Sequence, residues 1–523
     1  MKFSSPRHTK ESFKYIPDFL LGLYIFISQT FQFCTERYEW NQIKNIIFSI
    51  CLTAALFFII PRLHRQVSKI ELDCQADYNN KTAIITFILF FLLSFSILFL
   101  WLLGCFPGSF SPDSINQIAQ ATNGKYNNWH PVLHTLIFFS LPLKITGTIS
   151  AIILLQIVYF SLFIAFLALS LRRHINLCRT FLVIAAILLS PFTLNIITFP
   201  WKDVAFAITA AMCMIFSANI YFSNGLWIEK KRHLILFSVM LALSTIFRHN
   251  GLLFTLPLVA SLCFFTPKKK WITLALLSIL ILFTIKIPLY SNLNISAAGD
   301  RVTETCGFPL SIITYVAKEC PQCLDTQTAA FIEKMTEKDP LWKNFHDVSG
   351  FNSIKWKSVN TKVIEEYGRL KIISMAIKCF INSPMQSIKA VAGLTSYVYS
   401  VNSEQLINKY IQPNPFGITY NRLLFVEKAE QNYETFFYDS KIGSLFSCVG
   451  TTLIIMLSFA VFKTNLKNKM HIRRLLLCSP IYIYVFGTML FLSGNEIRFF
   501  FVVQLIWPPI LLILLKKESS HAQ

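Results

Sequence analysis

Acidic, basic and histidine side chains fall at or near the ends of long apolar runs, where a membrane tolerates them least. They form five clusters: Asp113; His130 and His134; Lys202 and Asp203; Arg248, His249 and Asn250; and Glu496 and Arg498. Ionisable groups at membrane depth are costly and by default indicate function. The alternative is that each group only caps its own helix at the membrane surface. Five clusters on one face of the membrane favour a single shared site.

Asp113 follows a turn-rich stretch that contains Pro107, Gly108 and Pro112. The sequence Ser-Pro-Asp-Ser is also good helix-capping chemistry, so a purely structural role stays open. The functional interpretation is a general base, because a carboxylate at a half-desolvated surface accepts a proton from an attacking hydroxyl. We therefore expect Asp113 to be the principal catalytic residue.

His130 and His134 are four residues apart, so one helical face holds both. A metal needs more ligands than these two. The sequence therefore predicts no metal site and requires no cofactor, although a divalent cation is compatible with it. We expect His130 to act beside Asp113 or to hold its loop in place, and His134 to support it.

Arg248 lies inside the apolar run 233–266, which is too long for one ordinary span. Folded as a hairpin, each arm has about 15 residues and is about 22 Å long. The hydrocarbon core is about 30 Å thick, so the hairpin tip would be sunk below the surface. A sunken arginine suits a phosphate group. We expect Lys202 and Arg498 to join it, with Asp203, His249, Asn250 and Glu496 in support; contact with bulk lipid headgroups is the alternative.

The elements that must position these residues are membrane helices. The chain has 523 residues, of which 54% are hydrophobic and 14% charged, whereas soluble domains carry about 25% charge. A spanning helix needs about 20 apolar residues. The sequence predicts about twelve spans, at about 16–33, 44–61, 83–105, 148–171, 180–198, 203–222, 233–247, 250–266, 271–290, 443–463, 474–493 and 498–515.

The net charge of +21 is explained by basic cytoplasmic loops, and nucleic-acid binding is not expected. Placing the N-terminus inside puts the basic clusters 172–179, 230–232, 268–270 and 463–474 on the cytoplasmic side, and the five polar clusters outside. Both termini are then cytoplasmic, and 131–147 is a juxtamembrane or re-entrant segment. The polar, basic N-terminus is not followed by a small-residue cleavage site, so no cleavable signal peptide is expected.

Four units follow from this topology: an N-terminal helix pair (1–82), a transmembrane core with an extracytoplasmic loop at 106–147 (83–290), an extracytoplasmic domain (291–442) and a C-terminal three-helix segment (443–523). The 291–442 domain is expected to be of mixed structure, with helices at 326–338 and 361–380. Its cysteines Cys306, Cys320, Cys323 and Cys379 favour a disulfide in an oxidising compartment, with the pairing open.

Seven short motifs resemble one known group of enzymes. They are PGSFSPDS at 107–114, NNWHPVLHT at 127–135, FPWKD at 199–203, RHNG at 248–251, CGFPLSII at 306–313, NSPMQSI at 382–388 and NEIRFF at 495–500. In their order and common face they resemble the GT-C superfamily of multispan glycosyltransferases, which use polyprenyl-phosphate sugars. More closely, they resemble a family of uncharacterised bacterial membrane proteins related to it.

This resemblance implies transfer of a hexose from a polyprenyl-phosphate sugar to a glycan or lipid-linked acceptor at the periplasmic face of a bacterial inner membrane. It implies Asp113 as the base, Arg498 as a contact to the donor phosphate, and inversion at the sugar carbon. O-antigen or another lipopolysaccharide glycan is the expected acceptor, with protein O-glycosylation the alternative. Many members have a second carboxylate in the first loop. This loop has none, so Asp203 or Glu496 would have to serve.

Three competing interpretations remain. An O-antigen ligase or polymerase also has about twelve spans and a large late loop, and relies on basic residues in that loop instead of Asp113. A transporter or flippase of lipid-linked glycans typically has internal repeats and mid-membrane charges, neither of which the sequence displays. A structural assembly protein would bind no polyprenyl phosphate.

Overall fold

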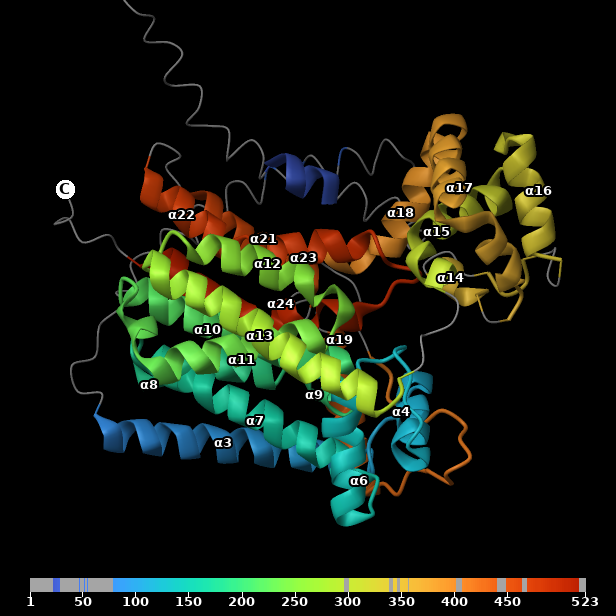
Figure 1. Cartoon of the computed structure of the whole chain (residues 1–523). Coiled ribbons are helices and arrows are strands. Elements are labelled where there is room, and N and C mark those ends of the chain that lie inside the picture. The colour runs from blue at the N-terminus through green and yellow to red at the C-terminus, as the bar shows by residue number, and fades with distance from the viewer. Residues whose placement is uncertain are drawn as a thin grey trace, which may run out of the picture.

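The computed structural model describes residues 22–28, 79–295, 301–337, 342–345, 349–355, 357–400, 407–439, 448–462 and 468–516, and the single residues 47, 51 and 54. Over these residues the chain is helical, with no strand and one isolated bridge between Phe110 and Ile411. Figure 1 shows a bundle of roughly aligned helices with a smaller helical lobe at one end. The expected all-α class is confirmed for the described part of the chain.

Five described stretches are long and apolar enough to cross a membrane. They are α3 (Asn80–Leu103), α7 (Ser150–Arg172), α10 (Lys202–Phe222), α13 (Lys268–Asn292) and Ile497–Leu515, which joins η8 (Ile497–Phe500) to α24 (Phe501–Leu515). A sixth is formed if α8 (Leu177–Leu188) and α9 (Pro191–Ile197), bent by 62°, count as one span. The bend coincides with Pro191, which has no N–H to continue the first helix.

The other expected spans correspond to shorter helices or lie outside the described residues. The shorter helices are α11 (Lys231–Ile246), α12 (Leu252–Leu262), α21 (Val449–Phe462), α22 (Lys469–Cys478) and α23 (Pro480–Met489). The predicted spans 16–33 and 44–61 fall mostly outside the described residues. The number twelve therefore stays a prediction, whereas the helices described do have the character of a helical membrane protein.

Burial differs sharply between central and peripheral helices. α10 packs against α24, α11 and α7, and nearly all its side chains are buried. α13 buries only Leu274 and Ser278 although its sequence is as apolar as that of a spanning helix. Apolar side chains on the outside of a bundle are stable in lipid and costly in water. This arrangement supports an integral membrane protein.

The segment 131–147 forms α5 (Val132–Thr135), a π-helical turn η3 (Leu136–Ser140) and α6 (Leu141–Thr146). In Figure 1, α6 and the preceding helix α4 (Pro112–Asn123) stand across the direction of the bundle helices at one end of the bundle. We call this end, which also meets the lobe, the site end. The crosswise position agrees with a juxtamembrane segment.

The lobe consists of α14 (Arg301–Thr305), α15 (Gly307–Glu319), α16 (Thr326–Met335), α17 (Thr361–Asn382) and α18 (Pro384–Tyr399). The helices expected at 326–338 and 361–380 are confirmed as α16 and α17. The lobe has its own apolar core, which includes Leu310, Phe331 and Met375. The expected mixed structure is wrong for the described part of 291–442, because its apolar residues recur at helical spacing and no strand forms.

The last part of the 291–442 segment packs on the bundle, not on the lobe. Phe110 donates its N–H to the Tyr410 carbonyl (2.9 Å) and accepts from the Gln412 N–H (2.8 Å). Ile407 and Ile418 belong to the bundle core, and α19 (Leu424–Asp439) packs against α3. The PGSF stretch of the first loop therefore holds an extended segment around Ile411, which follows the lobe in the chain, against the bundle.

Candidate functional site

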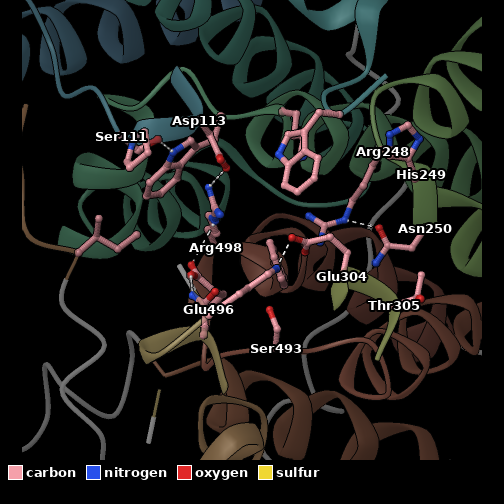
Figure 2. Close-up of a pocket in the computed structure, with 18 of the residues that line it drawn as sticks. Ser111, Asp113, Arg248, His249, Asn250, Glu304, Thr305, Ser493, Glu496 and Arg498 are labelled. Atoms are coloured by element: carbon pink, nitrogen blue, oxygen red, sulfur yellow. Dashed lines mark hydrogen bonds and ion pairs between the residues drawn. The ribbon is translucent and has the colours of Figure 1, made fainter. Parts of the chain in front are cut away.

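A cavity of about 860 Å³ lies where the site end of the bundle meets the lobe. Residues of the bundle and its loops line most of it, and the lobe contributes the rest (Figure 2). Seven of the ten residues singled out from the sequence line this cavity: Asp113, Lys202, Arg248, His249, Asn250, Glu496 and Arg498. The structure therefore brings together four of the five polar clusters, although they are far apart in the chain.

Asp113 is not the cap of its helix. Ser111 is the N-cap of α4, and its Oγ accepts a hydrogen bond from the Ser114 N–H. Pro112 occupies the first helical position and Asp113 the next, in the first turn. The capping alternative is therefore wrong, and the Asp113 carboxylate is available to the cavity, where Oδ2 accepts a hydrogen bond from Arg498 Nη1 (2.9 Å).

The electrostatic environment of Asp113 favours its ionised form. Burial alone would raise the pKa of its carboxyl group, but the positive charges of Arg498 and Lys202 outweigh burial and hold the pKa well below its usual value. Asp113 is therefore a carboxylate at any physiological pH. It is also a weak base for as long as Arg498 stays bonded to it.

Trp201 connects the first loop to the FPWKD motif. Its indole N–H donates to Ser111 Oγ (2.8 Å), and its ring stacks on Phe199 with centroids 4.2 Å apart. The Arg498 guanidinium lies over the same indole, 5.0 Å from the ring centroid. Trp201 thus orients both the cap of the Asp113 helix and the arginine that Asp113 binds.

Arg498 is surrounded by carboxylates. Besides Asp113, its Nε lies 3.2 Å from Glu496 Oε2 and 3.9 Å from Asp203 Oδ2. Figure 2 shows Arg498 between Asp113 and Glu496. In this structure its charge is therefore already compensated.

Arg248 is compensated as well, because it forms a buried ion pair with Asp203. Its Nε donates to Asn250 Oδ1 (2.7 Å), and its guanidinium lies 4.3 Å from the centroid of the Phe499 ring. Gly251 allows the tight turn between α11 and α12, since a Cβ there would lie 2.3 Å from the Ser244 carbonyl oxygen. Asp203 itself lies behind the cavity and acts on it through the two arginines.

Lys202 differs from both arginines. It begins α10 and lines the cavity, yet no carboxylate of the described chain forms an ion pair with it. Its nearest polar partner is His130, whose Nδ1 accepts from Lys202 Nζ at 3.4 Å. An anionic ligand can therefore pair with Lys202 in the bundle wall without displacing a protein carboxylate.

The two histidines lie behind the cavity wall and do not line it. His130 is buried, and burial, with Lys202 beside it, lowers its pKa to about 3. His134 is inaccessible: its Nδ1 is bonded to the Gln117 side-chain amide (3.0 Å), and its ring packs on Phe138, Phe139 and Phe247. His130 therefore positions Lys202 as a neutral acceptor, and His134 anchors the first loop.

The lobe supplies residues that the sequence did not reveal. Glu304, Lys355 and Arg369 line the cavity opposite the bundle, with Asn352 and Thr305 beside them. Lys355 is buried and ion-paired with Glu304. The charge of the lobe is ordinary for a soluble domain, so composition does not mark these residues. The one hint in the sequence is that Glu304 lies two residues before the CGFPLSII motif.

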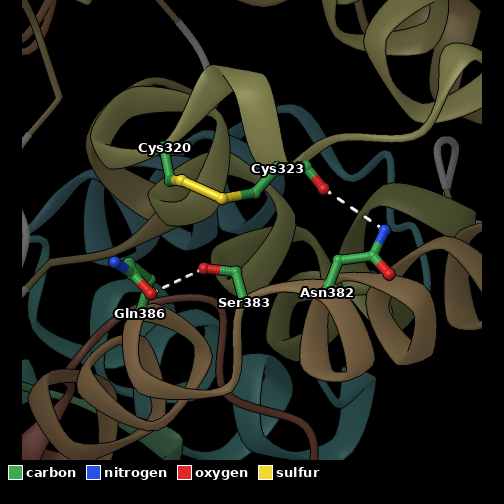
Figure 3. Close-up of a disulfide and its surroundings, with 5 residues drawn as sticks. All are labelled: Cys320, Cys323, Asn382, Ser383 and Gln386. Atoms are coloured by element: carbon green, nitrogen blue, oxygen red, sulfur yellow. Dashed lines mark hydrogen bonds between the residues drawn. A yellow bond between two sulfur atoms is a disulfide. The ribbon is translucent and has the colours of Figure 1, made fainter.

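None of the four lobe cysteines lines the cavity. Cys320 and Cys323 form a disulfide, while Cys306 and Cys379 are free and buried. The expected disulfide thus closes within the Cys-Pro-Gln-Cys turn (Figure 3), where the Asn382 amide donates to the Cys323 carbonyl (3.2 Å). In the described residues no group of three His, Cys, Asp or Glu side chains is placed to hold a metal ion.

No family model, curated protein or solved structure matches the chain. The resemblance to the GT-C superfamily therefore rests on the short motifs, five of which meet at the cavity: PGSFSPDS, NNWHPVLHT, FPWKD, RHNG and NEIRFF.

Proposed function

We propose that the chain is an integral membrane glycosyltransferase with a GT-C-like fold of about twelve spans. It transfers a hexose from a polyprenyl-phosphate sugar to a surface glycan such as O-antigen, at the periplasmic face of a bacterial inner membrane, with both termini cytoplasmic. The observation that carries this proposal is that Lys202, which forms no ion pair with the described carboxylates, and the ionised Asp113 line one cavity at the end of apolar helices.

In this proposal Lys202 holds the donor phosphate and Arg498 assists it. The bond between the sugar C1 and the phosphate oxygen breaks, and negative charge grows on the departing polyprenyl phosphate. Fixed cations in a water-poor cavity stabilise that charge more in the transition state than in the ground state. Arg248 lies deeper and supports the site through Asp203 and Asn250.

The donor phosphate also activates Asp113. When Arg498 donates hydrogen bonds to the phosphate in place of Asp113, Asp113 loses a stabilising partner and its pKa rises. It then takes the proton of the acceptor hydroxyl, whose oxygen attacks C1 from the side opposite the phosphate. The product is inverted at C1.

The test compares wild type with Asp113→Asn in liposomes supplied with labelled polyprenyl-phosphate sugars and a membrane glycan extract. Loss of a general base costs about 100-fold or more in rate, so Asp113→Asn should transfer at less than a hundredth of the wild-type rate. Tyr410→Phe, which changes another residue of the cavity wall and keeps the ring, is the matched control. A transfer rate in Asp113→Asn equal to that of wild type would show that Asp113 is not the general base.

A second candidate is an O-antigen ligase or polymerase. The observation that favours it is that two basic residues of the late segment, Lys355 and Arg369, line the same cavity. A ligase of this kind should keep activity in Asp113→Asn, which the first proposal expects to be nearly inactive. It should also lose activity in Arg369→Gln even at saturating donor.

A further inference from the structure

Helix α17 exposes an apolar stripe that nothing in the described chain covers. Its members are Leu370, Ile373, Ile377, Phe380 and Ile381. Leu370, Ile373, Ile377 and Ile381 are spaced three or four residues apart, and Phe380 is three residues after Ile377, so all five share one side of the helix. Leu370 is 84% exposed and Ile381 73%. A soluble surface rarely leaves such a continuous apolar patch in water.

The opposite side of the same helix is also apolar, because Ile372, Met375, Ala376 and Cys379 are buried in the lobe core. A helix that is apolar all round is stable only when both sides are covered. The stripe does not result from a helix end or a local distortion, since it begins after the single kink, at Gly368, and runs for more than three turns. Some further apolar surface must therefore cover it.

Basic side chains border the stripe. Arg369 and Lys371 flank Leu370 in the sequence. Lys378 follows Ile377, although its Nζ is already ion-paired with Asp325 (3.6 Å). On a helix of 3.6 residues per turn, Lys371 and Lys378 fall on one edge of the stripe and Arg369 falls on the other. An apolar face edged by lysine and arginine is typical of a helix that lies in the interface of a bilayer, where the basic groups reach lipid phosphates.

The arrangement of the helices is compatible with that position. In Figure 1, α17 stands across the direction of the bundle helices, at the site end. α18 packs against both α17 and the apolar helix α21, so α17 is one helix removed from the bundle. Exposed apolar residues also continue toward the lobe junction, at Leu490 and Phe491 of the loop after α23. Two residues after Phe491, the Ser493 carbonyl accepts from the Asn352 N–H of the lobe (2.7 Å).

We propose that α17 rests on the membrane leaflet at the site end and inserts its Leu370–Ile381 stripe among the lipid acyl chains. The occupant of this surface is lipid. The lobe is thereby held at two points, by α18 against the bundle and by α17 in the bilayer.

This contact has a consequence for the substrate. Arg369 directly precedes the stripe and lines the cavity, so an anionic head group that leaves the leaflet beside α17 meets Arg369 first. This consequence rests on the proposed transfer reaction, whereas the lipid contact does not.

Photo-crosslinking tests the contact. The cross-linking amino acid p-benzoylphenylalanine is placed at position 377, or at 370 as a second stripe position, in the full chain reconstituted in phosphatidylethanolamine and phosphatidylglycerol vesicles. The matched control is position 333 on α16, which is exposed on the same lobe. Irradiation followed by intact-mass measurement distinguishes lipid adducts from cross-linked chains.

We expect lipid adducts at 377 and 370, in several-fold higher yield than at 333. Cross-linking to a second copy of the chain, equal lipid labelling at 333, or no lipid adduct at either stripe position would overturn the proposal. Arg369→Gln tests the consequence separately. It should lower the transfer rate at limiting lipid-linked donor while leaving the lipid adduct at 377 unchanged, and an unchanged transfer rate would remove Arg369 from the substrate route without affecting the lipid contact.

Discussion

The bundle wall and the lobe wall of the cavity both hold a buried cation against a carboxylate. In the bundle, Arg248 and Asp203 are both shielded, with side-chain exposures of 6% and 1%. In the lobe, Lys355 is shielded to 2%, but its partner Glu304 is 36% exposed. Water therefore reaches one member of the lobe pair and neither member of the bundle pair.

Solvent access affects stability because a charge that is shielded from water is stabilised only by its ion-pair partner. Removing one partner of a fully buried pair leaves an uncompensated charge, and the cost is several kcal/mol. A pair with one solvated member can relax toward solvent. The bundle wall should therefore be rigid and intolerant of single substitutions, while the lobe wall should tolerate them.

The largest expected effect is in the bundle wall. Arg248→Met strands the Asp203 carboxylate, and we expect it to lower the free energy of unfolding by about 3–5 kcal/mol. Thermal unfolding in detergent micelles measures it as a lower Tm. Because Arg248 packs on Phe499, part of the loss comes from removed contact area.

The double variant Arg248→Met/Asp203→Asn separates the two causes. Neutralising Asp203 should recover much of the stability lost in Arg248→Met. The double variant should then be less destabilised than the sum of the two single variants. Equal Tm values for the single and the double variant would mean that the charge pair is not what stabilises this wall.

Lys202→Gln should have the next largest effect, on binding and not on stability. Charge-assisted hydrogen bonds contribute about 1.5–3 kcal/mol, so the Kd for a polyprenyl monophosphate probe should rise about 10-fold to 100-fold. The Tm should stay near that of wild type, because no carboxylate of the described chain is left unpaired. Lys231→Gln, the same change at the opposite end of the bundle, is the control, and equal Kd values for both variants would contradict the role of Lys202.

The same contrast explains how much of the site could be predicted from the sequence. Asp113, Arg248 and Arg498 stand out because a charge within or close to a long apolar run is rare. Lys355 and Arg369 belong to a segment of ordinary soluble charge, where nothing marks them. The partners could not be foreseen either: Asp113 and Arg498 are 385 residues apart, and only the fold brings them together.

The fold itself was predictable at the level of helices and less so at the level of spans. The apolar runs near α3, α7, α10 and α13 are long enough to define these helices. The run 180–198 is broken at Pro191, and the run 474–493 is divided into α22 and α23 at Pro480. The 131–147 segment was predicted not to span because of the positions of the basic loops, and it forms the short helices α5 and α6.

On the lobe side, Glu304→Gln should have a smaller effect than Arg248→Met. Lys355 loses a carboxylate partner that water already solvates, so we expect a loss of about 1–2 kcal/mol in the free energy of unfolding. Transfer activity should change less than in Lys202→Gln. If Glu304→Gln destabilises the chain as much as Arg248→Met does, solvent access is not the property that distinguishes the two walls.

The smallest effect is expected for His130→Gln, which decides whether His130 is a proton carrier or a support. With its pKa lowered to about 3, His130 stays neutral at physiological pH and only accepts from Lys202. The glutamine side-chain oxygen can do the same, so the rate should fall by much less than the roughly 100-fold expected on loss of an acid–base catalyst.

The unfolded chain protonates this histidine at its ordinary pKa of about 6.5, so wild type should lose stability as the pH falls below that value, by up to about 1.4 kcal/mol per pH unit. His130→Gln should lack that contribution between pH 6.5 and 5, where Asp113 remains ionised. A 100-fold rate loss with an unchanged stability profile would return His130 to the chemistry itself.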